Sequence, residues 1–121
     1  MALLSPVASA LLAALHVYIM ALEMFMWTTP RGRKAFRLTA EFAAQTKTMA
    51  ANQGLYNGIL AAGLVWGLAH PVAEFARQIR AFFCLAVVVA GFYGGVTSSR
   101  KIWVVQMTPG LVALASVYWD L

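Results

Sequence analysis

The sequence is short of charged residues. Only 11% of its 121 residues are Asp, Glu, Lys or Arg, whereas 62% are hydrophobic, and a soluble domain carries about 25% charged residues. So short a chain cannot cover that much apolar mass with charged surface. The composition excludes a disordered chain, a collagen-like chain and a coiled coil, and it disfavours a water-soluble globule. It therefore predicts an integral membrane protein.

Cysteine and the motifs of soluble enzymes are also scarce. The single cysteine, Cys84, cannot form an internal disulfide. The chain has no phosphate-binding loop, no dinucleotide fingerprint and no catalytic triad in a recognisable context. His16 lies in the middle of one apolar stretch and His70 at the end of another, so no metal site is expected. The cofactor, if any, is left unknown.

Four apolar stretches approach the length that a bilayer requires. A spanning helix needs about 20 predominantly apolar residues, and the candidates are Leu3–Trp27, Met49–Ala69, Ala81–Val96 and Ile102–Trp119. The third begins earlier, near Phe75, if arginine side chains extend from it to the interface. We expect residues 1–121 to form a single all-α domain, a bundle of four transmembrane helices.

Basic residues set the predicted orientation. The middle loop holds two of them, whereas the first and third loops together hold seven: Arg31, Arg33, Lys34, Arg37, Lys47, Arg100 and Lys101. Cytoplasmic loops carry the excess of Lys and Arg. We therefore expect a multi-pass protein of a bacterial inner membrane with both termini outside. Contact with anionic lipid and an anionic-ligand role are further interpretations of the basic loop.

The second helix is predicted to start before its span. Thr29-Pro30 is typical of an N-cap followed by proline at the first helical position. Neither Gly nor Pro interrupts the chain from Arg33 to Gln53. We expect one helix that begins near Pro30, extends below the membrane on the cytoplasmic side and continues through the second span.

Glycine spacing predicts close helix packing. Three pairs have the GxxxG spacing that lets membrane helices approach each other: Gly54/Gly58, Gly63/Gly67 and Gly91/Gly95. Packing within one protomer and packing between protomers are equally compatible with this pattern. Because four short helices enclose little interior, we expect a homo-oligomer.

Polar side chains of the spans gather toward the predicted cytoplasmic side. Ser9, His16 and Glu23 recur every seven residues, so they share one face of the first helix. Near the cytoplasmic end of that helix, Glu23 is at the depth of polar groups from the other spans: Asn52, Gln53, Asn57, Tyr93, Gln106 and Thr108. Ionisable groups within spans usually face protein or water. A polar pocket in the cytoplasmic leaflet is therefore predicted.

This pocket is expected to bind a small amphipathic or lipophilic ligand. Glu23 would supply the charge, and Tyr93 would form a wall with a hydroxyl donor. The orienting groups would be Asn52, Gln53, Asn57 and Gln106, while His16 could relay a proton. Three alternatives stay open: an enzyme that uses Glu23 or Tyr93 as general acid or base, a proton-coupled transporter that uses Glu23, and a structural protein without a ligand.

Several segments resemble a small four-helix membrane family of unknown function. They are the run from Asn52 to Gly58, the following Ala61–Leu64, the segment Ala90–Gly95, and Gln106 with Pro109. The resemblance covers nearly the whole chain. It implies a membrane location and brings no established activity.

The layout is also similar to that of the membrane-associated eicosanoid and glutathione enzymes. These are trimers of four-helix protomers with a polar site in the cytoplasmic half of the membrane. The basic stretch Arg33–Arg37 and the amides around Asn52 are placed like the glutathione contacts of that family, which makes glutathione a candidate partner. No glutamate follows Asn52 in the second span, unlike in that family. The small multidrug transporters offer a looser likeness, because they have four spans and a single glutamate in the first, where this chain has Glu23.

Overall fold

The computed structural model describes residues 2–121, and every regular element in that range is helical. The elements are α1 (Leu4–Phe25), α2 (Pro30–Phe36), α3 (Ala40–Ala69), α4 (Ala73–Thr97), the π-helical segment η1 (Trp103–Met107) and α5 (Thr108–Tyr118). The predicted all-α class is confirmed for the described chain. Two helices, α1 and α4, are long and apolar enough to cross a membrane, with mean hydropathies of 1.8 and 1.9, and Trp103–Tyr118 is a shorter apolar helix.

The start of α2 agrees with the predicted cap. Thr29 has an extended backbone, and its side-chain oxygen accepts a hydrogen bond from the Gly32 N–H at 3.3 Å. Pro30 occupies the first helical position, where its missing N–H costs nothing. Gly32 is buried, and glycine is needed at this position because a Cβ there would lie 1.9 Å from the backbone oxygen of Met26. The chain therefore turns tightly from α1 into α2.

The prediction of one helix from Pro30 through the second span is wrong, because the chain breaks between α2 and α3. Arg37 adopts the left-handed conformation, with φ 56° and ψ 50°, and ends α2. Thr39 then caps α3, since its hydroxyl accepts the Phe42 N–H at 3.1 Å. The helix that carries the second predicted span still begins at Ala40, well before Met49.

The chain divides into two compact units. The larger comprises the residues up to Ala13 together with Leu60–Leu121, and the smaller comprises Ala14–Ile59. The larger unit thus contains α4, η1 and α5 with the first turns of α1 and the last turns of α3. The smaller contains the rest of α1, α2 and the first part of α3. The single domain predicted over residues 1–121 stays a prediction.

All three glycine pairs are used inside the chain. Gly54 and Gly58 face α1, Gly63 and Gly67 face α4, and Gly91 and Gly95 face the segment around η1. The contacts are close: a Cβ on Gly91 would lie 2.8 Å from the Met107 backbone nitrogen. Packing within one protomer therefore accounts for the GxxxG spacing. The homo-oligomer stays a prediction.

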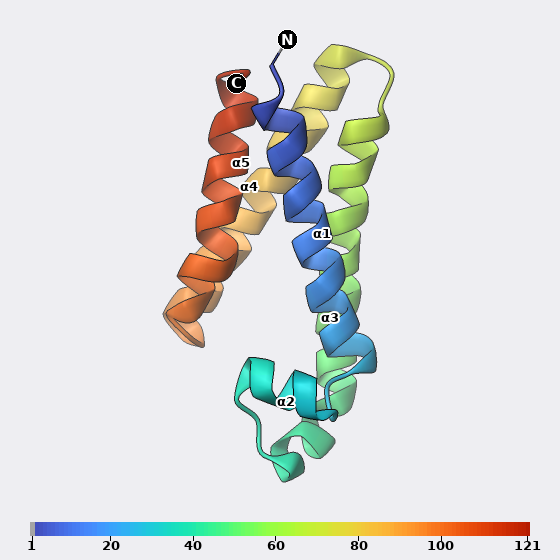
Figure 1. The fold of residues 1–121 in the computed structure, drawn as a ribbon, viewed down its shortest axis with the longest axis vertical. Coiled ribbons are helices and arrows are strands. Elements are labelled where there is room, and N and C mark those ends of the chain that lie inside the picture. The colour runs from blue at the N-terminus through green and yellow to red at the C-terminus, as the bar shows by residue number, and fades with distance from the viewer. Residues whose placement is uncertain (1) are drawn as a thin grey trace. The chain divides into compact units, whose positions relative to one another are not determined.

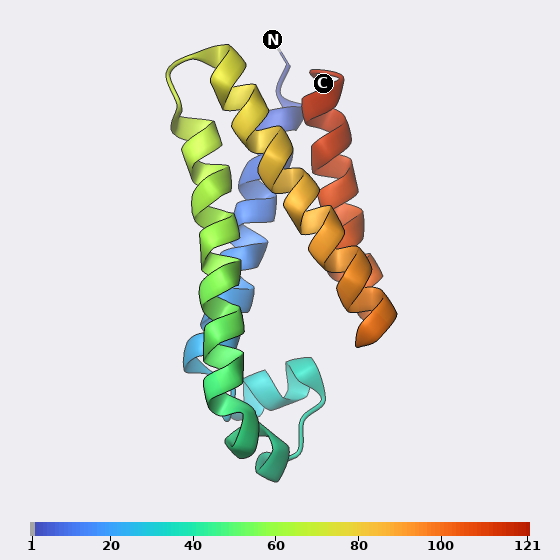
Figure 2. The same ribbon diagram turned by 180° about the vertical axis from the view of Figure 1, so that it is seen from behind.

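In the larger unit, α4 and α5 lie side by side and the two ends of the described chain meet (Figures 1 and 2). The Ser5 N–H donates to the Leu121 oxygen at 2.9 Å. Two arginines of α4 join this end: Arg77 Nη2 donates to the Tyr118 oxygen and Arg80 Nη1 donates to Ser5 Oγ, both at 2.7 Å. Arg77 thus satisfies a carbonyl group that the end of α5 would otherwise leave without a partner, and Arg80 ties the start of α1 to α4.

The fourth predicted span begins with a widened turn. The π-helical segment η1 directly precedes Thr108 and Pro109. Since proline has no N–H, it cannot continue the ordinary hydrogen-bond ladder. The Thr108 hydroxyl reinforces the turn by donating at 2.8 Å to the Trp103 oxygen, which also accepts the Thr108 backbone N–H.

Candidate functional site

The smaller unit contains a carboxylate and an amide in direct contact. Asn57 Nδ2 donates to Glu23 Oε1 at 2.5 Å, and it also lies 3.3 Å from the Gln53 backbone oxygen. Glu23 comes from the last turns of α1 and Asn57 from the middle of α3, and both are half-buried. The hydrogen bond thus joins two helices at the place where the sequence predicted a polar site.

Glycines let the two helices approach at this point. A Cβ on Gly54 would lie 2.5 Å from Met24 Cγ and 3.0 Å from Glu23 Cβ. A Cβ on Gly58 would lie 2.6 Å from Met20 Sδ. The two methionine side chains therefore pack over the glycines, in the same contact between α1 and α3 that holds Glu23. Methionine is flexible and polarizable, so such walls adapt to apolar groups of different shape.

The carboxylate keeps hydrogen-bonding capacity for another molecule. An ionised carboxylate has two oxygens and about four acceptor positions. Within the smaller unit, Glu23 accepts one side-chain hydrogen bond, from Asn57, and no Lys or Arg of that unit forms an ion pair with it. The arrangement can therefore accept a hydrogen-bond donor or a cationic group.

The other predicted site residues of the smaller unit have different surroundings. Gln53 is exposed and adjoins the pair through its backbone oxygen. Asn52 is exposed, and its Nδ2 donates to the Thr48 oxygen of its own helix at 3.0 Å. His16 is fully buried and makes an interaction within the protein. The structure thus brings Glu23 and Asn57 together with Gln53 beside them.

Two predicted site residues belong to the larger unit. Tyr93 is 69% exposed on α4. Gln106 is half-buried in η1 and makes an interaction of its own. Their membership in one site with Glu23 stays a prediction.

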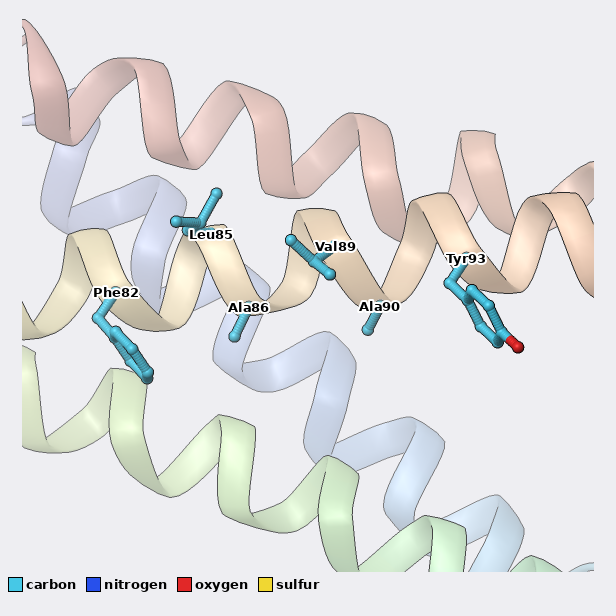
Figure 3. Close-up of a pocket in the computed structure, with 6 residues that line it drawn as sticks. All are labelled: Phe82, Leu85, Ala86, Val89, Ala90 and Tyr93. Carbon is cyan, nitrogen blue, oxygen red and sulfur yellow. The ribbon is translucent and has the colours of Figure 1, made fainter.

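Tyr93 ends an apolar groove that the sequence did not single out. The groove has a volume of about 520 Å³, and Figure 3 shows its lining side chains along one helix: Phe82, Leu85, Ala86, Val89, Ala90 and Tyr93. All six belong to α4. These residues recur at intervals of three or four, which places them on one face of a helix. The recurrence of apolar residues at this spacing was the sequence signal that could have revealed the groove.

Fold and site together define an all-helical protein with two helices apolar enough to cross a membrane and one interhelical carboxylate–amide pair. The chain belongs to a family described as protein of unknown function (DUF1304), whose model matches residues 10–118. The uncharacterized protein YpaA of Lactococcus lactis subsp. lactis (strain IL1403) is 28% identical over 121 residues, which cover 98% of this chain and 100% of YpaA. No solved structure matches the chain. The expected relation to a family of unknown function is confirmed.

Proposed function

We propose that this protein is a multi-pass integral membrane protein that binds a small amphipathic molecule at Glu23 and Asn57. The apolar surface of its helices supports the membrane location. Within the most apolar windows of α1 and α4, only 28% and 22% of the residues are buried. A core helix of a soluble protein would be mostly buried, and soluble monomers rarely expose large contiguous apolar patches. Lipid is the solvent that suits such surfaces.

Charge and chain ends support the proposed orientation. The segment from α2 to the start of α3 is rich in Lys and Arg, which favours the cytoplasmic side. The hydrogen bond between Ser5 and Leu121 joins the start of α1 to the end of the chain. The two therefore lie on the same side, which is the arrangement that an even number of spans produces. In this orientation, Glu23 lies in the cytoplasmic leaflet of a bacterial inner membrane.

The observation that carries the ligand proposal is the half-buried Glu23 carboxylate, held by one amide in the contact between α1 and α3 where Met20 and Met24 also pack. A polar headgroup that donates hydrogen bonds would bind the carboxylate, and the thioether side chains would contact its apolar portion. Such hydrogen bonds are strengthened where the surroundings are of low dielectric. An amphipathic molecule combines the two properties that this site offers.

A second candidate is a structural protein in which the pair only fixes α1 against α3. The direct hydrogen bond between Asn57 and Glu23 favours it, because each group is already the other's partner. Hydrogen bonds between membrane helices contribute about 0.6–2 kcal/mol. Such a role requires no bound molecule.

Retention of a bound molecule distinguishes the two candidates. The protein is extracted from membranes in a mild detergent, and native mass spectrometry records any mass that stays bound. We expect an adduct on the wild type that is lost in Glu23→Gln and in Asn57→Leu. Gln45→Leu is the matched control, since this amide is exposed on α3 and forms no part of the site. The absence of an adduct on the wild type would favour the structural role. So would an adduct that both site variants retain as well as the wild type does.

A further inference from the structure

The segment after α1 is an ordered platform, not a loose loop. The Trp27 indole Nε1 donates to Thr46 Oγ1 at 3.0 Å, and its ring lies 4.8 Å from the Phe36 ring. Arg33 Nε donates to the Leu38 oxygen at 3.3 Å across the end of α2. These contacts hold α2 beside the start of α3 and against Trp27, which follows α1 (Figure 1). The orientation of its side chains is therefore fixed by packing.

Positive charge covers the exposed part of this platform. Its exposed cations, termed here the basic surface, are Arg31, Lys34, Arg37 and Lys47. From Thr28 to Thr48 the one acidic residue is Glu41. No carboxylate of the smaller unit forms an ion pair with these cations. Four guanidinium or ammonium groups thus face outward without compensation.

Exposed apolar side chains accompany the basic surface. Phe25 is 73% exposed at the end of α1, and Phe42 and Met49 on α3 are 47% and 71% exposed. A site for a free anion in water would gain nothing from apolar neighbours exposed to solvent. A membrane surface provides both phosphate groups for the cations and an apolar layer for these side chains.

We infer that the basic surface binds the headgroups of anionic phospholipids. The cations contact lipid phosphates while Phe25, Phe42 and Met49 contact the acyl region beneath. This inference rests on the proposed membrane location but not on a ligand at Glu23. A protein that retains its ligand yet shows no headgroup preference would contradict the inference and leave the proposed function standing.

Lipid titration of the purified full-length protein tests the inference. Native mass spectrometry measures the binding of phosphatidylglycerol and of phosphatidylcholine to the wild type and to two double variants. Arg31→Gln with Lys34→Gln removes two charges from the basic surface. Arg100→Gln with Lys101→Gln removes two charges elsewhere. We expect the first variant to bind phosphatidylglycerol about 25-fold more weakly, roughly fivefold for each cation, and the second to change binding less than twofold.

A third variant guards against a folding defect. Arg37 has a left-handed backbone, which glycine adopts readily, so Arg37→Gly removes a cation and keeps the turn. We expect it to weaken phosphatidylglycerol binding about fivefold. Equal losses in both double variants, equal binding of the two lipids to the wild type, or displacement of phosphatidylglycerol by inorganic phosphate would each overturn the inference.

Discussion

Asn57 on α3 and Glu23 on α1 are joined by one hydrogen bond of 2.5 Å between residues 34 positions apart in the chain. The same Asn57 nitrogen lies within 3.3 Å of the Gln53 oxygen on its own helix. One amide thus links a carboxylate of the first helix to the backbone of the third. The rotation of α1 against α3 in this unit depends on that link and on the glycines beside it.

Replacing only one partner of this pair is expected to cost more than replacing both. Asn57→Leu leaves the half-buried carboxylate without its donor, so we expect a loss of about 1–2 kcal/mol in the free energy of unfolding. Glu23→Leu together with Asn57→Leu replaces both polar groups and is expected to recover most of that loss. Thermal unfolding in detergent, followed by circular dichroism, measures the two effects. A double variant no more stable than Asn57→Leu would show that the two side chains are not coupled.

Two glycines of α4 are expected to respond differently to alanine. A Cβ on Gly91 would lie 2.8 Å from the Met107 backbone nitrogen, so the backbone itself must move. A Cβ on Gly94 would meet only the Ile102 side chain, at 3.2 Å. We expect Gly91→Ala to lower the free energy of unfolding by about 1–3 kcal/mol. Gly94→Ala is expected to leave it unchanged or to raise it, because alanine is the better helix former. Unfolding temperatures of the two variants in detergent test this, and equal values would argue against the α4–η1 contact.

Arg77 is expected to protect the end of α5. Its guanidinium donates to the Val117 oxygen at 3.1 Å and to the Tyr118 oxygen at 2.7 Å. Cations near helix C-termini also interact favourably with the helix dipole. In Arg77→Gln, amide hydrogen exchange of the last turn of α5 should become faster, whereas Arg100→Gln should leave it unchanged. Unchanged exchange in both variants would mean that α5 ends independently of α4.

Two buried serines offer a matched comparison. The Ser9 hydroxyl is buried and forms no hydrogen bond of ordinary geometry with any described residue. The Ser116 hydroxyl is equally buried and donates to the Ala113 oxygen at 2.7 Å. Because an unsatisfied buried polar group costs about 1–3 kcal/mol, Ser9→Ala should raise the unfolding temperature and Ser116→Ala should lower it. A lower temperature for Ser9→Ala would indicate a hydrogen bond with the neighbouring Cys84 thiol.

Hydropathy predicts the long apolar helices well. The first span was expected at Leu3–Trp27, and α1 runs over Leu4–Phe25. The third was expected at Ala81–Val96, with an earlier start near Phe75 as the alternative, and α4 runs over Ala73–Thr97. The end of α1 follows from composition, because its apolar residues stop before Thr28, Thr29 and Pro30. The start of α4 does not, since its first turns contain Glu74, Arg77 and Arg80.

The break between α2 and α3 does not follow from hydropathy. No Gly or Pro marks it, and Arg37 takes up a left-handed conformation that its residue type does not favour. The available signal was Thr39 with Glu41 in the first turn of α3, a typical helix start. A local cap thus decided the boundary against an otherwise uninterrupted helical sequence.

The contact between Glu23 and Asn57 could be predicted in outline, whereas the membership of Tyr93 and Gln106 in the same site stays a prediction. Depth along each helix follows from residue number, and it identified Glu23 and Asn57 as members of one level. Direction around the helix separates residues of equal depth: Asn52 lies about 140° from Asn57 and bonds its own helix. Which groups touch depends on how closely α1 approaches α3, and that is set by the packing of Met20 and Met24 on two glycines.

Methyl NMR of the methionines is the most direct test of a ligand site at Glu23. Met20 and Met24 pack beside Glu23 where α1 meets α3, whereas Met107 packs against Gly91 in the larger unit and provides an internal control. The protein, methyl-labelled at methionine and held in detergent, is titrated with a total lipid extract of the membranes that produced it. We predict saturable shifts of the Met20 and Met24 signals that exceed those of Met107 and vanish in Asn57→Leu. Shifts that are absent, or equal for all three methionines, would contradict a binding site at Glu23 and Asn57.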